Sequence, residues 1–239
     1  MGDKKKMDVS IIIPAYNEEK RLGTTLEKIH NYFKDKGINF EIIVVDDGSR
    51  DGTVNLVKNF SIEHPEVRLR CHLKNKGKGA AVKTGVLTTE GDVILFTDAD
   101  LSTPIEEFGK LKKAIDSGYD IAIGSRGVQG AKVKIKQNLL RRLIGIAGSY
   151  LIRLILTDRF SDTQCGFKMF KSDCGKALFQ EQKISGFAFD IEILYKAIKK
   201  NYKVKEIPVE WLNSPESRVS VIKDPIRVFR DLLKIKMGL

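Results

Sequence analysis

The sequence predicts an α/β fold with a mostly parallel central sheet and helices on both faces. Apolar runs rich in β-branched residues alternate along the chain with segments of helical periodicity. The runs are apolar at consecutive positions, which is typical of strands buried on both faces of a parallel sheet. A chain of 239 residues with 42% hydrophobic residues can bury one large core, so we expect a single domain over residues 1–239.

The expected elements alternate in chain order. The strands are predicted at 9–14, 40–47, 67–73, 92–100 and 119–125, and the helices near 18–36, 51–64, 79–90 and 104–118. In an open sheet of this kind, ligands bind beyond the carboxyl ends of the strands. Three of these ends are followed by polar residues, which we expect to converge on one cleft: Asn17 and Glu18, Asp46 and Asp47, Asp98 and Asp100.

Asp98 and Asp100 predict a metal site at the end of the fourth strand. In extended backbone, residues i and i+2 point the same way, and Ala99 leaves room between the two carboxylates. Two such charges at the rim of a cleft repel each other unless a cation lies between them. Mg²⁺ or Mn²⁺ fits, because these ions take oxygen ligands and bind substrate phosphates. The alternative is that Asp100 caps the next helix, although Ser102 or Thr103 is better placed for that.

A glycine-rich segment at 74–85 lacks both common nucleotide signatures, the P-loop and the dinucleotide fingerprint. Lys76, Lys78 and the amides of a helix that starts near Gly79 can still attract a phosphate. The alternative is a glycine-rich turn with solvated lysines. The spacing of the histidines and the absence of a nucleophile elbow argue against a zinc or serine hydrolase. The three histidines are His30, His64 and His72.

The composition indicates an anionic partner and a reducing compartment. The net charge of +11 favours nucleic acid, a phosphorylated substrate or an acidic membrane face. No interleaved aromatic platform or recognition helix is apparent, so we expect no nucleic-acid partner. Cys71, Cys165 and Cys174 lack metal-ligand spacing, and residues 1–19 are too poor in apolar residues for a signal peptide. We therefore expect a cytoplasmic protein with free thiols.

A family resemblance rests on motifs spread along most of the chain. VSIIIPAYNEE, IIVVDDGSRDGT, GDVILFTDAD and GSR, over residues 9–126, resemble the nucleotide-sugar domain of family 2 glycosyltransferases of the GT-A fold. DTQCGFKMF (162–170), GFAFDIEILYKA (186–197) and EIPVEW followed by ESR (206–218) are similar to dolichyl-phosphate glucosyltransferases, which charge a polyprenyl phosphate with glucose from UDP-glucose. The resemblance implies a donor half at 9–126 and an acceptor half at 127–239.

The resemblance also implies roles for individual residues of the donor half. Asp46 accepts a hydrogen bond from the base, and Asp98 and Asp100 hold Mg²⁺ or Mn²⁺ on the diphosphate. Ser102 stands where related mannosyltransferases often carry glutamine, so a third metal contact is not implied. The residues implied to bind the nucleotide sugar are Pro14, Ala15, Tyr16, Asn17, Glu18, Asp46, Lys78, Asp98 and Ala99.

In the acceptor half, Arg126, Lys168 and Arg218 are candidates for holding the diphosphate or the acceptor phosphate, with a solvated surface charge as the alternative for each. Asp190 matches the position of the base in relatives with hydroxyl acceptors, and Asp162 is a second candidate. Arg126, Asp162 and Asp190 are therefore the implied catalytic group. A phosphate acceptor is largely ionised at neutral pH. We accordingly expect the two aspartates to orient hydroxyls; helix capping or an ion pair with a lysine is the alternative.

The segment 138–157 predicts attachment to a membrane. It is long enough to span a bilayer, but its arginines argue against crossing and lie along one stripe. With the basic segment KVKIK before it, we expect a helix in the plane of an anionic cytoplasmic membrane surface. The alternative is a helix that packs on the core or on a second subunit.

These expectations combine into an inverting, metal-dependent glucosyltransferase that acts on a polyprenyl phosphate. A GDP-mannose-dependent enzyme and a transferase with a soluble sugar or protein acceptor remain open. A nucleotidyltransferase would also use strand-end carboxylates and a metal, but it normally has a basic glycine-rich loop after the first strand, where this chain has AYNEEK.

Overall fold

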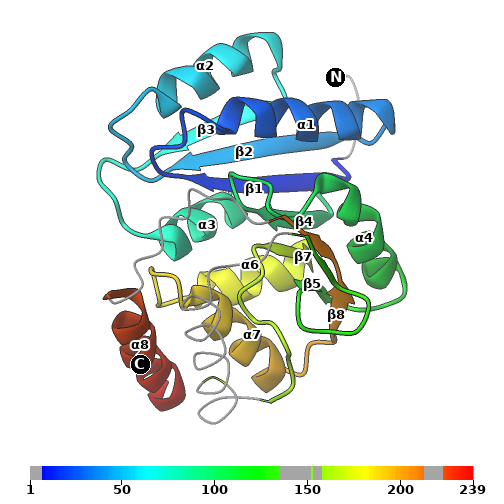
Figure 1. Ribbon diagram of the computed structural model, residues 1–239, viewed down its shortest axis with the longest axis vertical. Helices are drawn as coiled ribbons and strands as arrows, with labels where there is room; N and C mark the ends of the chain where they lie inside the picture. Colours follow the sequence, from blue (N-terminus) through cyan, green and yellow to red (C-terminus); the bar gives the residue numbers. More distant parts are fainter. Residues whose placement is uncertain (1–6, 135–151, 153–157, 213–222, 239) are drawn as a thin grey trace.

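The protein is built around a seven-stranded sheet of order β3-β2-β1-β4-β7-β5-β8. A computed structural model describes residues 7–134, 152, 158–212 and 223–238, and Figure 1 shows the strands in this order from top to bottom. Strand pairing is parallel except where β7 pairs with β4 and β5. The strands are β1 Val9–Ala15, β2 Phe40–Asp46, β3 Val67–Cys71, β4 Val93–Thr97, β5 Ile121–Ser125, β7 Phe167–Lys171 and β8 Val204–Pro208.

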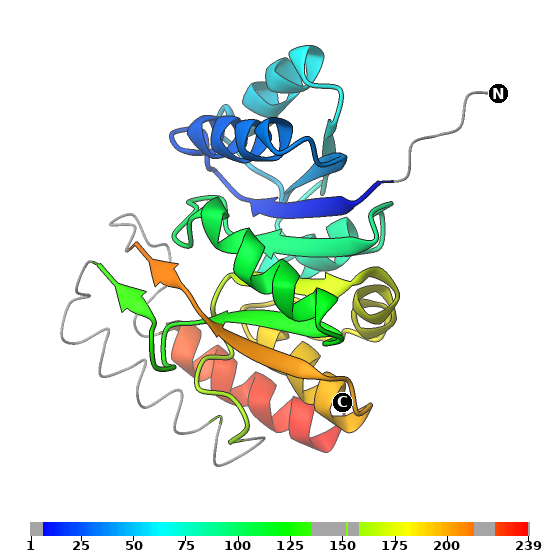
Figure 2. The same cartoon turned by 90° about the vertical axis from the view of Figure 1, so that its right-hand side faces the viewer.

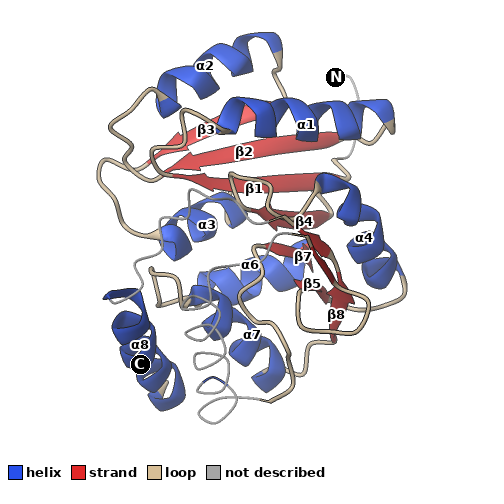
Figure 3. Cartoon of the chain, in the orientation of Figure 1, coloured by secondary structure: helices blue, strands red, loops and turns tan. Residues whose placement is uncertain are grey.

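Helices cover both faces of this sheet (Figure 3). One layer contains α1 Leu22–Asp35, α2 Thr53–Glu63 and α4 Phe108–Asp116, which the 3-10 helix Ile105–Glu107 precedes. The other contains α3 Lys78–Val86, α6 Ser172–Gln180, α7 Phe189–Lys199 and α8 Lys223–Met237, where α8 packs on α7. The three-layer arrangement confirms the predicted fold class.

Two hydrophobic cores, one on each face, explain why β1, β2, β4 and β5 are largely apolar at consecutive positions. Successive side chains of a strand point to opposite faces. Ile11 and Ile13 of β1 therefore join the core under α1, while Ile12 joins the core under α3. Helix α1 contributes buried side chains at every third or fourth position, namely Leu22, Leu26, Ile29 and Phe33.

The five predicted strands and four predicted helices of the first half are confirmed, with one error that matters for the site. The fourth strand was expected to continue to Asp100, but β4 ends at Thr97. Residues 98–101 form a turn in which the Leu101 amide donates to the Asp98 carbonyl at 3.1 Å, and Leu101 has a φ of 47°. The predicted cap from Ser102 or Thr103 is also wrong, because the 3-10 helix begins without a side-chain cap.

The second half adds strands that the sequence analysis did not assign. β7 enters the sheet between β4 and β5 in the antiparallel direction, and β8 forms the edge beside β5. Beyond these strands, β6 Lys132–Val133 pairs with β9 Glu210–Trp211. Figure 2 shows this small second sheet extending past the ends of β5 and β8.

The predicted interfacial helix at 138–157 lies outside the described residues, apart from Ile152, which is buried against the α3-side core. Arg218 also lies outside them. Within the described ranges, no helix combines the length and the apolar character that crossing a membrane requires.

Candidate active site

The acidic residues that follow β2 and β4 lie at one edge of the sheet. β1 pairs in parallel with both of these strands, so their carboxyl ends meet there. The pairing of Ala15 with Asp46 aligns the ends of β1 and β2. On the other side of β1, the Thr25 hydroxyl of α1 donates to the Ala99 carbonyl at 2.7 Å and fixes the turn that carries Asp98 and Asp100.

Asp98 lies between a lysine and a glycine that has no room for a side chain. Lys78 Nζ, at the start of α3, is 2.7 Å from Asp98 Oδ1. A Cβ atom on Gly166, in the loop before β7, would lie 1.9 Å from Asp98 Oδ2. Burial alone would lower the pKa of Lys78, but the charges of Asp98 and Asp190 outweigh it and raise that pKa. Lys78 is therefore a fixed cation at the carboxylate.

Asp100 has a cationic neighbour of its own. Its Oδ1 accepts the Ser102 amide at 3.0 Å, and its Oδ2 is 3.6 Å from an Nη atom of Arg21. The same guanidinium donates to Glu18 Oε1 at 2.9 Å, so it links the first strand end to the fourth. Asp100 does not cap the next helix, which begins at Ile105.

The Asp98–Asp100 turn has the chemistry of a divalent-cation site. Both carboxylates face positive charge, Lys78 on one side and Arg21 on the other, and both remain partly exposed, at 33% and 19%. Two carboxylates one residue apart are hard oxygen ligands of the kind that Mg²⁺ and Mn²⁺ prefer. The residues therefore fit the predicted metal, even though the backbone is a turn rather than the expected extended strand.

Lys168 and Asp190 form a buried ion pair behind this turn. Lys168 Nζ donates to Asp190 Oδ1 at 2.5 Å and to the Cys165 carbonyl at 2.7 Å. Lys168 is only 1% exposed, so it is not the solvated surface charge that was one expectation, and its Nζ is directed at Asp190. Burial raises the pKa of Asp190, against the lowering effect of Lys168 and Lys78. Asp190 therefore forms the ion pair with a lysine that was the alternative expectation for it.

Arg126 is held by Asp162. Its Nε and Nη2 atoms donate to the two carboxylate oxygens at 2.6 and 2.9 Å, and its backbone amide donates to Asp162 Oδ2 at 3.0 Å. The guanidinium also lies 5.3 Å from the centre of the Trp211 ring. Burial alone would raise the pKa of Asp162, but the bonds and charge of Arg126 outweigh it and lower that pKa. Asp162 is thus an ionised partner of Arg126, not an unpaired base.

The glycine-rich segment serves close packing. A Cβ atom on Gly77 would lie 2.4 Å from the Ser185 carbonyl oxygen, and one on Gly79 would lie 2.7 Å from that of Ile184. The Ala80 amide, in the first turn of α3, donates to the Ser185 carbonyl at 3.2 Å. This amide is therefore already paired, and the glycines let the 184–186 loop approach the helix start. Lys78 alone keeps the expected position beside the strand-end carboxylates.

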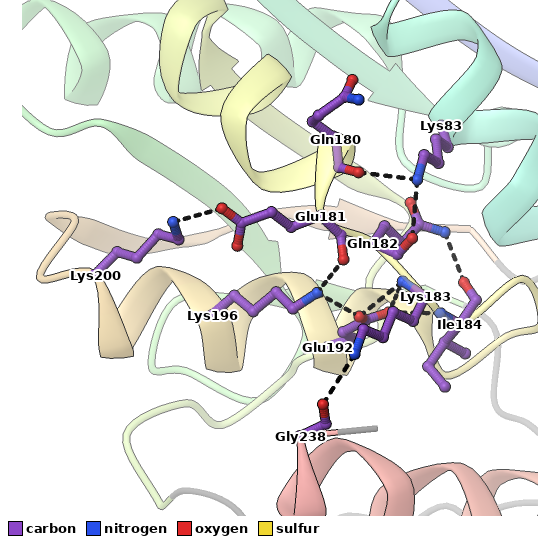
Figure 4. A network of polar contacts seen from close by, with 10 residues as sticks. All are labelled: Lys83, Gln180, Glu181, Gln182, Lys183, Ile184, Glu192, Lys196, Lys200 and Gly238. Atoms are coloured by element: carbon purple, nitrogen blue, oxygen red, sulfur yellow. Dashed lines mark hydrogen bonds and ion pairs between the residues drawn. The ribbon is translucent and has the colours of Figure 1, made fainter.

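A polar network holds that loop in place (Figure 4). Lys83 Nζ of α3 donates to the carbonyls of Gln180 and Gln182 at 3.1 and 2.9 Å. The buried carboxylate of Glu192 in α7 accepts the amides of Lys183 and Ile184 at 2.9 and 2.8 Å. Helices α3 and α7 thus both bind the segment 180–184, which leads into the 184–186 loop.

A pocket of about 410 Å³ opens at the carboxyl ends of β2 and β3. Of the expected nucleotide residues, Tyr16 and Asp46 line it, while Pro14, Ala15, Asn17 and Glu18 do not. The Asn17 side-chain oxygen instead accepts the Arg50 amide at 2.7 Å. Residues that the sequence analysis missed complete the wall: Gly48, Ser49, Arg50, Val54, Cys71, His72, Leu73, Lys74 and Asn75.

The two aspartates at the end of β2 have different surroundings. Asp46 accepts the amides of Gly48 and Ser49, each at 3.1 Å, within its own turn. Asp47 accepts the Lys76 and Gly77 amides at 2.9 and 2.8 Å and contacts His72 Nδ1 at 2.7 Å. Asp47 therefore anchors the segment that leads from the pocket to Lys78. The amides that it binds are 29 and 30 residues away, so no local sequence signal indicates this role.

Strand-end carboxylates on a mostly parallel sheet, with a pocket beside them, are the arrangement of a GT-A glycosyltransferase, and the chain belongs to glycosyltransferase family 2. The family described as glycosyl transferase family 2 matches residues 10–179. Curated relatives give a finer likeness. A dolichyl-phosphate beta-glucosyltransferase of Trichomonas vaginalis is 38% identical over 98% of this chain and 74% of its own. The Saccharomyces cerevisiae and Homo sapiens proteins of that name are 32% and 30% identical, over 99% and 98% of this chain and 76% of theirs.

Solved structures show the same fold at much lower identity. Glucosyl-3-phosphoglycerate synthase of Mycobacterium tuberculosis, in complex with Mn²⁺ and UDP-glucose, superposes with a TM-score of 0.70 at 16% identity, over 98% of this chain and 80% of that one. Mannosyl-3-phosphoglycerate synthase of Rubrobacter xylanophilus superposes with a TM-score of 0.71 at 17% identity, over 96% and 73%. At this identity the likeness establishes the fold.

Proposed function

We propose that this protein transfers glucose from UDP-glucose to a polyprenyl (dolichyl) phosphate, with inversion at the anomeric carbon. The observation that carries the proposal is the match to dolichyl-phosphate beta-glucosyltransferases at 30–38% identity over 98% or more of this chain. The site geometry supports it, because Asp98 and Asp100 lie at the sheet edge where a GT-A fold binds its donor.

The donor lies along this edge, from the pocket at β2 and β3 to the turn after β4. β2 and β4 are separated by β1 alone, so their ends are two strand spacings, or about 10 Å, apart. A nucleoside diphosphate has a comparable length. Its base would occupy the pocket lined by Tyr16 and Asp46, and its diphosphate would reach Asp98 and Asp100. The base is proposed as uracil because structural neighbours bind UDP-glucose, not from a contact in this chain.

Asp98 and Asp100 are proposed to hold Mg²⁺ or Mn²⁺. When bound there, the ion supplies a Lewis acid that neutralises charge on the diphosphate, an effect worth several kcal/mol in such sites. The Mn²⁺ and UDP-glucose named for a structural neighbour agree with this choice.

Lys78 is proposed to act on the leaving group. Its Nζ is 2.7 Å from Asp98 Oδ1, so a diphosphate that arrives at Asp98 also arrives beside a lysine ammonium. Because the sugar–phosphate bond breaks with negative charge developing on the diphosphate, a cation held at this point stabilises the transition state more than the ground state. The buried Lys168–Asp190 pair behind Lys78 keeps the surroundings fixed.

The acceptor phosphate attacks without a general base. A phosphate monoester has a second pKa of about 6 and is mostly dianionic at neutral pH. Asp190 and Asp162 are both occupied by cations, Lys168 and Arg126 respectively. Their proposed role is therefore to fix those cations and orient hydroxyl groups rather than to accept a proton. In-line attack opposite the leaving group gives a β-linked product from an α-linked donor.

Attachment to an anionic cytoplasmic membrane surface is also proposed, and α8 adds support from described residues. Phe229, Leu233 and Met237, at i, i+4 and i+8, are 43%, 40% and 64% exposed along one side of this helix. The remaining exposed positions of α8 are rich in basic residues, including Arg227, Arg230, Lys234 and Lys236. An apolar stripe with cationic flanks is typical of helices that lie on anionic lipid. Flotation with anionic vesicles at low salt tests this, and failure to float would refute it.

A donor and acceptor screen tests the transfer reaction. The full chain is incubated with Mn²⁺ or Mg²⁺, a short polyprenyl phosphate and either UDP-glucose or GDP-mannose, and release of nucleoside diphosphate is measured. Release with UDP-glucose that depends on the polyprenyl phosphate supports the proposal. Release with GDP-mannose alone, or only with soluble sugar or protein acceptors, would replace the proposed donor or acceptor.

Asp100→Ala tests the metal role. We expect turnover to fall by at least about 100-fold, because the variant loses a ligand of the ion that stabilises the leaving group. Asp116→Ala is the matched control, since Asp116 is an exposed aspartate at the end of α4 whose carboxylate pairs with Lys112 at 2.6 Å. Full activity of Asp100→Ala, in a chain with unchanged circular dichroism, would remove the metal from the mechanism.

A further inference from the structure

We propose that His30, His64 and Glu66 form a zinc site separate from the candidate active site. Over the part of the chain that the structure describes, these are the three metal-ligating side chains whose donor atoms all lie within 4.8 Å of one another. His30 is buried, and the other two are partly exposed. No spacing in the sequence predicts the cluster, because its two histidines come from different helical segments.

The cluster lies near the amino ends of β2 and β3, at the end of the sheet opposite the strand-end carboxylates. α1 and α2 lie side by side (Figure 1) and both run back from the carboxyl ends of the strands. His30 lies in the second half of α1, His64 caps the end of α2, and Glu66 precedes the start of β3. β2 spans 7 residues, so the cluster and Asp98 lie at opposite ends of the strands, about 20 Å apart along the strand direction.

Backbone hydrogen bonds hold the two outer ligands in place. The His64 amide donates to the Phe60 carbonyl at 3.2 Å, and the His64 carbonyl accepts the Val67 amide at 2.9 Å. The Glu66 carbonyl accepts the Ile42 amide of β2 at 2.9 Å. Both residues are therefore anchored through the main chain to α2 and to the sheet, and their side chains start from fixed positions.

His30 presents both ring nitrogens to side-chain oxygens. Its Nδ1 lies 3.2 Å from the Asn31 side-chain oxygen, and its Nε2 lies 2.5 Å from Glu66 Oε1. When Nδ1 donates to Asn31, the Nε2 lone pair faces the carboxylate, and a metal ion at this point would bind both atoms. A hydrogen-bonded Nδ1 that leaves Nε2 as the ligand is also the usual arrangement of metal-binding histidines.

The position of His64 favours a metal ion at this contact. The His30 side chain is 5% exposed and is held between the rings of Phe40 and Phe60, whose centres lie 5.8 and 6.3 Å away, so its Nε2 starts from a fixed position. The His64 ring centre lies 4.2 Å from that of His30 and brings a second imidazole nitrogen to the same point. A proton shared by His30 and Glu66 leaves this nitrogen unused, whereas a metal ion binds all three.

The donor set selects zinc. Two imidazole nitrogens and one carboxylate oxygen, with water as the fourth ligand, are a common tetrahedral zinc set, whereas Mg²⁺ prefers oxygen alone. Zinc–ligand bonds of about 2.0 to 2.2 Å place ligand atoms about 3.3 Å apart in a tetrahedron. His30 Nε2 and Glu66 Oε1 are 2.5 Å apart, and all three donor atoms lie within 4.8 Å of one another, so side-chain rotations of about 1 Å are enough to form the site.

Zinc binding by the full chain tests the proposal. The protein is stripped with a chelator, supplied with excess Mg²⁺ to fill oxygen-donor sites, and titrated with Zn²⁺; bound zinc is measured after gel filtration. Cobalt is then substituted to record its visible spectrum. We expect one retained zinc per chain, a tetrahedral cobalt spectrum and a rise in melting temperature with zinc. A chain that retains no zinc overturns the proposal and leaves His30 and Glu66 as an ion pair.

Substitutions assign the zinc to the cluster. His64→Ala and Glu66→Gln should each weaken zinc binding by at least about tenfold, and both positions are partly exposed, so the fold should survive. Asp98→Asn, at the candidate active site, and Cys71→Ser, at the exposed thiol, should bind zinc as tightly as the unaltered chain. Retention of zinc by His64→Ala, or its loss in Asp98→Asn, contradicts the assignment. Glucosyl transfer by His64→Ala is measured separately with Mg²⁺. Because zinc binding is measured without this activity, failure of the zinc site and failure of the proposed function can be distinguished.

Discussion

Lys78 should compete with the metal for Asp98 when no donor is bound. Its Nζ lies 2.7 Å from Oδ1 of Asp98, one of the two residues proposed to hold the divalent ion. A metal that binds before the nucleotide must therefore displace an ammonium group from its carboxylate. We predict that Lys78→Met binds Mn²⁺ more tightly than the unaltered chain in the absence of nucleotide.

The exposure of the pair sets the size of the effect. The Lys78 and Asp98 side chains are 22% and 33% exposed, between a surface ion pair and a buried one. Exposed pairs contribute about 0.2 to 1 kcal/mol, and hydrogen bonds to charged groups about 1.5 to 3 kcal/mol. An intermediate value of about 1 to 2 kcal/mol corresponds to a Kd for Mn²⁺ that is roughly tenfold lower in the variant.

Titration of Mn²⁺, followed by the electron paramagnetic resonance of the free ion, measures this Kd. Lys112→Met is the control, because it removes the same charge from an exposed pair on α4 whose Nζ lies 2.6 Å from Asp116. With UDP present the order should reverse, because the proposed role of Lys78 is to bind the diphosphate. An affinity for Mn²⁺ in nucleotide-free Lys78→Met that equals or falls below that of the control would refute the competition.

Two further substitutions test contacts around the site. Asp162→Asn leaves the Arg126 guanidinium without its ionised partner and should lower the free energy of unfolding by about 2 kcal/mol at pH 7, measured by urea denaturation. Folding lowers the pKa of Asp162, so the stabilisation from its carboxylate is present above the unfolded-state pKa and is lost as the pH falls through the folded-state pKa. The difference in unfolding free energy between the two chains should therefore shrink below about pH 4. A difference that stays constant with pH would contradict the pairing. Gly166→Ala places a Cβ atom 1.9 Å from Asp98 Oδ2 and should weaken Mn²⁺ binding by roughly tenfold or more. In the control, Gly109→Ala, the added Cβ atom meets nothing within 4 Å, so this variant should bind Mn²⁺ normally. Equal Mn²⁺ binding by both variants would contradict the close approach of Gly166 to Asp98.

The first half of the fold could be predicted because its signals are local. Each buried strand is a run of consecutive apolar residues, and each helix repeats its apolar positions every third or fourth residue. The position of Asp98 and Asp100 followed from the end of such a run. The turn at 98–101 could not be predicted, because it depends on Leu101 adopting a positive φ, which is unusual for a branched apolar residue.

The contacts of the site that the sequence does not reveal join distant parts of the chain. Lys168 is buried because β7 inserts between β4 and β5, an arrangement that a five-residue segment does not indicate. The glycines at 77 and 79 pack against carbonyls more than 100 residues later, so the local sequence does not reveal why glycine stands there. Asp190 and Asp162 have cationic partners 22 and 36 residues away, which no spacing rule connects.

The insertion of β7 means that residues 9–126 cannot be separated cleanly from the rest of the chain. A fragment that ends near residue 126 would lose β7, which pairs with β4 on one side and with β5 on the other. The backbone edges of β4 and β5 would then be exposed. It would also lose Gly166, which borders Asp98. Chimaeras that aim to combine the sugar specificity of one enzyme with the lipid specificity of another must therefore exchange β7 together with β4 and β5, or leave all three in place.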